Sequence, residues 1–408
     1  MKKYVIVGAG GRALGMFAKP FAAELKPFAE LAGVFDVNPV RATILSEQAG
    51  GVPVYNDFDA MISEVKPDAV IVTTPDALHH EYIIRALEAG CDAISEKPMT
   101  TDAEKCREII EAERRTGKKV IVTFNCRYMP YVVRIKELLQ SGTIGDILHV
   151  TLNWSLDTKH GADYFRRWHR QMKNSGGLLI HKSTHHFDMV NWWLDDEPAT
   201  VYANGSRLFY GPTREERGRT CSTCAHTSTC EFHYDINASA FTKSFYKDAE
   251  QHDGYYRDQC VFGDDIDIYD TMSLSVKYSK GTQMSYSLNA YSPYEGWKAT
   301  FVGTKGRIEA EDSHSGFATQ EPFNYVRVYN HKGELMTVQS RKATGDHGGG
   351  DQRLRRMIFA GDVADPLGQM AGSRAGAMSL LIGAAANISI VSGEQIVISD
   401  LLKETVTK

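Results

Sequence analysis

The strongest constraint on the fold is an alternation of short apolar runs with amphipathic segments over the first 123 residues. The apolar runs have the length of strands buried on both faces, and the segments between them have helical spacing. Repeated strand–helix–strand units imply right-handed crossovers and a parallel, doubly wound sheet. The predicted strands are Tyr4–Val7, Leu31–Asp36, Ala69–Thr73, Asp92–Ser95 and Val120–Phe124, and the predicted helices include Ala42–Ala49, His80–Ala89 and Ala103–Arg115.

After about residue 146 the hydrophobic period changes to two, which indicates a mostly antiparallel sheet that is open on at least one face. Turn residues such as 279–281 and 331–333 interrupt the pattern. We therefore predict an α/β domain over residues 1–123 and an α+β domain over 124–408. The second domain's predicted strands are Val150–Asp157, Thr200–Tyr210, Ile266–Tyr278, Thr282–Ala290, Trp297–Ala310 and Tyr325–Gln339, and its last predicted helices are Gln352–Ala360 and Ser373–Ser392.

Charge and hydropathy argue against two classes of partner. The 46 basic and 51 acidic side chains give a net charge of −5, whereas a nucleic-acid binder would normally carry a basic face. No stretch approaches the roughly 18 consecutive apolar residues of a membrane span, and the longest candidate, around Met378–Ala386, contains Gly383. The first apolar run ends at Gly8, too early for a signal peptide. We expect a cytoplasmic protein that binds neither nucleic acid nor membranes.

A glycine-rich turn follows the first strand and precedes a helical segment, as in a dinucleotide-binding Rossmann domain. Glycine lets the backbone approach a pyrophosphate, and the helix N-terminus offers free N–H groups to it. Asp36 ends the second strand 23 residues beyond Ala13, where a carboxylate accepts ribose hydroxyls and repels a 2′-phosphate. We therefore predict NAD as the cofactor. The predicted residues of this site are Gly8, Gly10, Gly11, Arg12, Ala13 and Asp36.

Three segments, Thr73–His79, Ala86–Gly90 and Glu96–Pro98, resemble the Gfo/Idh/MocA oxidoreductases, a family of sugar and cyclitol dehydrogenases and related proteins. The resemblance covers essentially the whole chain, including Asn125–Tyr128 at the start of the second domain. It implies dimers or tetramers that form through the exposed sheet face. It also implies further cofactor-binding residues, namely Thr73, Thr74, Pro75, His79, Glu96, Lys97 and Arg127.

The resemblance implies that Lys97 contacts the reacting hydroxyl, as a base or as an electrostatic anchor, and that His185 is the acid–base histidine. The Lys97-Pro98 bond could be cis. The family commonly has Asp at the position of His181, and this chain does not. We predict Lys97, His185 and His181 as catalytic residues. A metal site made of His181, His185 and Asp188 is a weaker alternative.

Two enzymatic functions fit these residues. The first is NAD-dependent oxidation of a secondary hydroxyl, at C3 of a sugar or glycoside. The second is a glycoside hydrolase that uses NAD catalytically. It would oxidise C3, eliminate the aglycone, add water and reduce the ketone, with His181, Lys182 and His185 moving the protons. A non-catalytic sensor is disfavoured because Lys97 and His185 are both present.

The run Tyr164–Arg170 combines aromatic rings with positive charge, which suits a pyranose that carries an anionic group. A basic, solvated turn is the alternative. The loop 346–351 before the C-terminal helices could close over a substrate. The predicted substrate-binding residues are Arg166, Arg167, Trp168, Lys182 and His347.

An insert at about residues 211–262 contains four of the seven cysteines. The spacing of Cys221, Cys224, Cys230 and Cys260 fits a structural zinc site, with His226 or His233 as alternatives to the last ligand. Free thiols in an irregular insert are the other interpretation.

Overall fold

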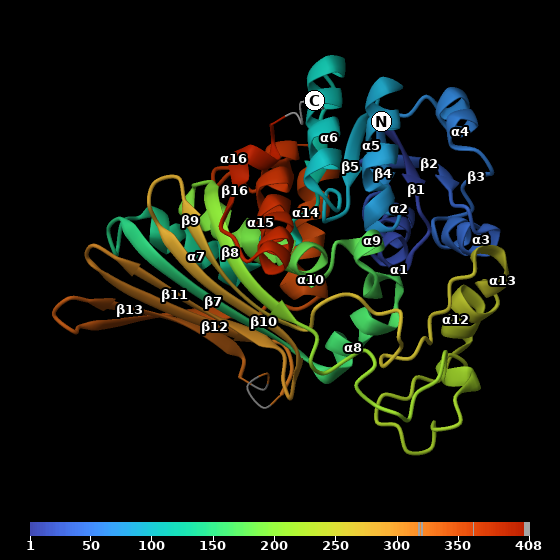
Figure 1. The fold of residues 1–408 in the computed structure, drawn as a ribbon. Coiled ribbons are helices and arrows are strands. Elements are labelled where there is room, and N and C mark those ends of the chain that lie inside the picture. Colours follow the sequence, from blue (N-terminus) through green and yellow to red (C-terminus); the bar gives the residue numbers. More distant parts are fainter. Residues whose placement is uncertain (317–318, 320, 362, 404–408) are drawn as a thin grey trace, which may run out of the picture.

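The N-terminal part of the protein is built around a seven-stranded sheet. The computed structural model describes residues 1–316, 319, 321–361 and 363–403. The strand order is β15-β6-β5-β4-β1-β2-β3, and all neighbouring strands run parallel except β15, which joins the edge antiparallel to β6. This order confirms the predicted doubly wound α/β domain (Figure 1). The strands are β1 (Lys2–Val7), β2 (Ala29–Phe35), β3 (Val54–Tyr55), β4 (Ala69–Val72), β5 (Asp92–Ser95), β6 (Val120–Val122) and β15 (Ala371–Gly372).

Both faces of this sheet are buried. Along β1, Val5 and Val7 belong to one apolar cluster, while Tyr4 and Ile6 belong to a second cluster on the opposite face. This explains the continuous apolar runs, because a strand covered on both faces needs apolar residues at every position. The helical segments of this part are α1 (Gly11–Ala13), η1 (Leu14–Ala18), α2 (Lys19–Ala22), α3 (Pro39–Gln48), α4 (Phe58–Val65), η2 (Asp76–Leu78), α5 (His79–Glu88) and α6 (Ala103–Thr116).

The second sheet has nine strands in the order β14-β13-β12-β11-β7-β10-β9-β8-β16. All neighbouring pairs are antiparallel except β7 with β10, as the period-two pattern predicted. Exposed and buried residues alternate strictly along β9 from its second residue, so one face packs on helices and the other is open. The strands are β7 (Ile147–Asp157), β8 (Pro198–Ser206), β9 (Thr271–Tyr278), β10 (Gln283–Ser292), β11 (Gly296–Gly303), β12 (Gly306–Ser313), β13 (Phe323–Asn330), β14 (Leu335–Arg341) and β16 (Ile396–Val397).

Four predicted strands were wrong in extent, and one of them, Thr200–Tyr210, ends at Ser206 as β8. The predicted strand Trp297–Ala310 is a hairpin, because the chain turns between Gly303 and Gly306. The predicted strand Tyr325–Gln339 also splits at its turn, and residues 266–270 lie outside β9. The remaining helical segments are η3 (Asn125–Tyr128), α7 (Pro130–Gln140), α8 (Thr158–Arg166), η4 (Trp168–Arg170), α9 (Met172–Ser175), α10 (Leu178–His181), α11 (Ser183–Leu194), η8 (Asp346–Gly349), α14 (Gly350–Phe359), α15 (Ser373–Ser392) and α16 (Ile398–Leu401).

Helix α15 lies between the two sheets and packs against β8, α11 and α6 (Figure 1). By length and composition it could cross a membrane, unlike the shorter stretch identified from the sequence, and 67% of its most apolar window is buried inside the protein. A buried core helix has this composition because it contacts protein on most sides.

The cysteine-containing insert connects β8 to β9 and is largely irregular (Figure 1). It contains η5 (Cys221–Thr223), α12 (Ala240–Thr242), η6 (Lys243–Lys247) and α13 (Glu250–Asp253). The buried carboxylate of Asp270 anchors its start by accepting backbone hydrogen bonds from Leu208, Phe209 and Tyr210. An antiparallel bridge between Thr220 and Gln259 joins its two ends. These contacts give an irregular segment a defined position.

Candidate active site

A cavity of about 890 Å³ lies where the two domains meet. Its walls combine the loops after β1, β4 and β5 with residues from α8, α10, α11, the insert and the loop before α14. The carboxyl ends of parallel strands β1, β4 and β5 therefore open into it, as is usual for ligand sites in doubly wound folds.

The glycine-rich turn after β1 forms one wall of the cavity. At Gly8 the backbone has φ +94°, and a Cβ there would lie 2.5 Å from the backbone N of Thr74. Gly10 and Gly11 face the cavity, while Ala13 is buried in the domain core. Any side chain at Gly8 would thus displace the loop that packs against this turn, and Ala13 acts through packing rather than through ligand contact.

Asp36 lies immediately after β2 with its carboxylate at the cavity edge. Its oxygens accept hydrogen bonds from the backbone N–H of Ala9 (2.5 Å) and of Asn38 (2.7 Å). Burial raises the pKa of Asp36, but these two hydrogen bonds favour its charged form. The backbone of the glycine-rich turn can approach the pyrophosphate of NAD, and the Asp36 carboxylate beside it can accept the ribose hydroxyls.

Two loop residues hold the turns around this cleft together. The Thr73 hydroxyl donates to the carbonyls of Val7 (3.0 Å) and Gly8 (2.6 Å). His79 is buried, with Nδ1 2.7 Å from the Pro98 carbonyl and Nε2 2.9 Å from the Thr74 carbonyl. His79 therefore positions the loops after β4 and β5 rather than presenting a free nitrogen to a ligand. Thr74 and Pro75 line the cavity.

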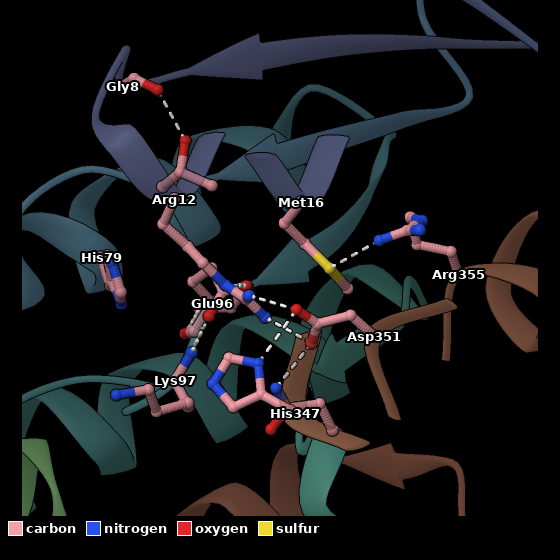
Figure 2. A network of polar contacts seen from close by, with 12 residues as sticks. Gly8, Arg12, Met16, His79, Glu96, Lys97, His347, Asp351 and Arg355 are labelled. Carbon is pink, nitrogen blue, oxygen red and sulfur yellow. Dashed lines mark hydrogen bonds and ion pairs between the residues drawn. The ribbon is translucent and has the colours of Figure 1, made fainter. Parts of the chain in front are cut away.

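Arg12 is held by two carboxylates (Figure 2). Its guanidinium donates to Glu96 (2.8 Å) and, through both terminal nitrogens, to Asp351 (2.7 and 3.1 Å). Asp351 also contacts Nδ1 of His347 (3.0 Å). Burial alone would raise the pKa of Asp351, but His347 and Arg12 hold it well below its usual range. The predicted loop residue His347 is thus tied to the cofactor turn through one carboxylate.

Lys97 projects into the cavity from the loop after β5, where the Lys97-Pro98 bond is cis. Its ammonium donates to the backbone carbonyl of His181 (3.1 Å). Burial lowers the pKa of Lys97 to about 8, although the nearby carboxylates of Asp76 and Glu96 oppose the shift. Lys97 is therefore a cation whose proton can be exchanged near neutral pH.

His181 ends α10 and contacts a residue that the sequence analysis did not select. Its Nδ1 lies 2.5 Å from a carboxylate oxygen of Asp76, which is 3% exposed. Burial lowers the pKa of His181 well below its usual value and raises that of Asp76. Asp76 belongs to the segment Thr73–His79, so the family resemblance already pointed to its loop. A carboxylate from another domain thus meets the imidazole at the position where the resemblance implies Asp.

His185 lies on α11 and faces the same cavity. Its ring packs edge-on against Phe124 with centroids 6.1 Å apart. Burial lowers the pKa of His185 well below its usual value, so the imidazole is neutral at neutral pH. The helix is interrupted at Lys182, so His181 and His185 come from two successive helices, α10 and α11.

Lys182 and a neighbouring aromatic surface form the substrate side of the cavity. The Lys182 ammonium lies 5.4 Å from the ring centroid of Trp154. His186 stacks on the same indole at 3.6 Å and contacts the Tyr286 hydroxyl (2.7 Å). Burial lowers the pKa of Lys182, and the nearby carboxylate of Glu295 opposes this shift.

Besides Ala13, two predicted site residues lie outside the cavity. Arg127 was predicted to bind cofactor, but its guanidinium makes a buried, bidentate ion pair with Asp188 (2.8 and 2.6 Å). Arg166 was predicted to bind substrate, but it donates to the carbonyls of Phe232 and Gln259 and so anchors the insert. A guanidinium that is satisfied inside the protein has no donors left for a ligand. Arg167 and Trp168, in contrast, do line the cavity.

Two family models match this chain. The first, described as the oxidoreductase family's NAD-binding Rossmann fold, matches residues 2–124, and the second, its C-terminal alpha/beta domain, matches residues 136–397. The chain belongs to the Gfo/Idh/MocA oxidoreductase family. Its N-terminal domain is therefore the NAD-binding domain of this family of enzymes, as the glycine-rich turn and Asp36 predicted.

The Gfo/Idh/MocA relatives include one protein that is similar over almost its whole length. The Bacillus subtilis (strain 168) protein YteT is 39% identical over 94% of both chains. The inositol 2-dehydrogenase of Rubrobacter xylanophilus is 29% identical over 49% of this chain and 54% of its own length. The D-glucoside 3-dehydrogenase of Escherichia coli (strain K12) is 31% identical over 47% of this chain and 54% of its own length. These two alignments thus span about half of each protein.

Solved structures of the Gfo/Idh/MocA type share the complete fold. The WlbA dehydrogenase from Bordetella pertussis, solved with NADH and UDP-GlcNAcA, has a TM-score of 0.66 at 18% identity, covering 97% of this chain and 98% of that one. At this identity the similarity shows the fold.

The cysteine cluster does not form the predicted zinc site. Cys221, Cys224, Cys230 and Cys260 line one small cavity of about 20 Å³ and form no disulfide with one another. Over the residues that the structure describes, no group of three or more His, Cys, Asp or Glu side chains could hold a metal ion. The Cys221 sulfur instead accepts a hydrogen bond from Arg166 (3.3 Å). The alternative set His181, His185 and Asp188 also fails, because Asp188 is used by Arg127.

Several cavity residues were missed because they come from segments without a recognisable motif. Glu295, between β10 and β11, lies 2.8 Å from Nδ1 of His160 on α8 and 3.7 Å from Nδ1 of His314. Burial alone would raise the pKa of Glu295, but these imidazoles hold it well below its usual range. Nothing in the local sequence links three residues so far apart, so only the fold reveals this group.

Proposed function

We propose that this protein is an NAD-dependent dehydrogenase that oxidises a secondary hydroxyl of a sugar or glycoside, at C3. The observation that carries the proposal is the convergence of Lys97, His181 and His185 on one cavity beside the cofactor turn. NAD, when bound, would accept a hydride from the carbinol carbon. The protein must supply a base for the hydroxyl proton and a group that stabilises the alkoxide. The name of the D-glucoside relative supports C3 as the position.

The protonation states of Lys97, His185 and His181 indicate which residue performs each of these tasks. With a pKa of about 8, Lys97 is mostly an ammonium at neutral pH and can stabilise negative charge on the substrate oxygen. His185 is neutral at that pH and can accept the hydroxyl proton. His181 is a second neutral imidazole, and Asp76 fixes its orientation through Nδ1.

The charge on the substrate side supports an anionic sugar, such as one bearing a carboxylate. The Lys182 ammonium faces the cavity, and the carboxylate that attracts it, Glu295, is already contacted by His160 and His314. Arg167, also on the cavity wall, is already 3.4 Å from Asp163. Lys182 is therefore the cation that we assign to the anionic group, with Trp154 beside it to pack against the sugar ring.

The pair of His181 and Asp76 also keeps the hydrolase as a second candidate. Elimination of an aglycone needs one group to remove the C2 proton and another to protonate the departing oxygen. His181, which is neutral and oriented by Asp76, can remove the C2 proton, and the ammonium of Lys182 on the same cavity can protonate the departing oxygen.

One experiment tests both functions. The purified protein is incubated with NAD and a panel of inositols, aldoses, neutral aryl glycosides and aryl glucuronides, and reduced NAD and released aglycone are followed together. Steady formation of reduced NAD without aglycone is the expected result. Aglycone release without matching reduced NAD would establish the hydrolase instead. The Lys97→Ala protein, which should bind NAD normally, is the control for contaminating activity.

The proposal also covers the cellular location and the oligomeric state of the protein. A cytoplasmic location is supported by the free thiols, since reduced cysteines are typical of that compartment. The predicted dimer or tetramer is tested by light scattering of the purified protein.

A further inference from the structure

The cysteine-containing insert packs against the surface of the NAD-binding domain. Phe245 of η6 is fully buried in the same apolar cluster as Leu14 and Leu45 of the Rossmann domain. Nearby, Nδ2 of the buried Asn38 donates to the carbonyl of Ala249 (2.9 Å). Figure 1 shows α12 and α13 beside α3 at the edge of the N-terminal domain. The insert is therefore docked where β2 ends, next to the ribose-binding position.

Residues of the insert also line the cofactor cleft itself. Tyr246, Asp253 and Tyr255 all face the cavity. The Tyr246 hydroxyl lies 3.2 Å from the place that a Cβ on Gly11 would occupy, directly over the glycine-rich turn. The insert thus adds side chains to a cleft that a Rossmann domain would otherwise leave open on this side.

The charged side chains at this edge of the cofactor cleft come from both the Rossmann domain and the insert. Arg41 lies in the first turn of α3, just beyond Asp36, and makes an ion pair with Asp253 of the insert. The side chains of Arg41 and Asp253 are only 10% and 17% exposed, and Tyr255 lies beneath the guanidinium at 6.0 Å. Arginine near the end of the second strand is the residue that accommodates the 2′-phosphate of NADP in Rossmann domains. Here one of its terminal nitrogens donates to the carboxylate of Asp253 instead, while the other is buried without a hydrogen-bond partner among the described residues.

We infer that Asp253 is a cofactor-specificity residue, which excludes NADP by occupying Arg41 and by placing a second carboxylate beside Asp36. Asp36 rejects a 2′-phosphate by repulsion and accepts the ribose hydroxyls of NAD. Because the charge of Arg41 is paired with Asp253, it compensates that repulsion less than an unpaired arginine would. The inference concerns cofactor binding alone, so it does not depend on which substrate the enzyme uses.

The test measures dissociation constants of NAD and NADP for the full-length protein, by quenching of tryptophan fluorescence without substrate. The wild-type protein should bind NAD more tightly than NADP. Asp253→Asn removes the carboxylate and frees Arg41, so NADP should bind about tenfold to a hundredfold more tightly, with NAD changed less than about threefold. In Arg41→Met/Asp253→Asn the gain for NADP should disappear. Asp248→Asn, at an exposed carboxylate of the same insert paired with Lys243, is the matched control and should leave both constants unchanged.

Several results would overturn the inference. They are a wild-type protein without preference for NAD, an Asp253→Asn protein whose NADP affinity is unchanged, and a gain that survives in the double variant. If Asp253→Asn does not fold, Arg41→Met provides the test. It leaves Asp253 unpaired near Asp36, so NADP binding should weaken at least threefold more than NAD binding, and equal effects would contradict the role of Asp253.

Discussion

The pH dependence of the reaction should follow the protonation of Lys97. If the ammonium is the active form, kcat/KM is proportional to the protonated fraction of this side chain. With a pKa of about 8, that fraction is about 90% at pH 7 and about 10% at pH 9. We therefore expect kcat/KM to fall about tenfold between these two pH values. The neutral imidazole of His185 imposes no loss on the acid side until well below its usual pKa.

The assay is the initial rate of NAD reduction at limiting substrate and saturating NAD, at constant ionic strength from about pH 6 to 10. Lys97→Arg is the informative variant, because a guanidinium keeps its proton throughout this range. Its absolute rate should be lower, but the alkaline fall should vanish. Lys97→Met removes the charge and should reduce kcat/KM at least about a hundredfold at every pH.

Two results would refute the reasoning. A kcat/KM that rises about tenfold through pH 8 would mean that neutral Lys97 removes the proton, which makes it the base. An alkaline fall that persists in Lys97→Arg would mean that another group titrates there.

The other predictions concern three different parts of the structure. Asp76→Asn should lower kcat about tenfold to a hundredfold with little effect on KM, because an amide holds the His181 imidazole less firmly in the orientation that Asp76 fixes, and an unchanged kcat would contradict a role for this pair. Lys182→Gln should reduce kcat/KM for an aryl glucuronide about tenfold while changing the neutral glycoside less than threefold, and equal losses would argue against the anionic sugar. Asp188→Asn should lower the free energy of unfolding by about 3–5 kcal/mol, measured by urea denaturation, because Arg127 is left charged and unpaired in the interior.

The ion pair of Arg134 with Glu137 is the matched control for the last prediction. Both of its side chains are nearly half exposed, so water already solvates the two charges. Glu137→Gln should therefore change the unfolding free energy by less than about 1 kcal/mol. If the two substitutions cost the same, burial is not what makes the pair with Asp188 important.

The chain's architecture was readable from the sequence because it depends on local periodicity. The apolar runs of the first domain and the period-two strands of the second occur at the predicted places, and the Ser373–Ser392 helix has the predicted bounds. Errors occurred where a turn interrupts a run of strand-forming residues, as at Gly303 and Gly306, because periodicity alone does not show where a strand reverses.

The cofactor turn and Asp36 could be located from the sequence, since each occupies a fixed place in a motif, and the family resemblance pointed to Lys97 and His185. The pairing of the remaining charges, in contrast, follows from the tertiary structure. It directed Arg127 and Arg166 into the protein interior, because buried guanidiniums need acceptors wherever the fold provides them. It also brought Asp76 to His181, 105 residues away, and Asp253 to Arg41, 212 residues away. Electrostatic partners depend on distance in space, so residue types and spacing along the chain do not identify them.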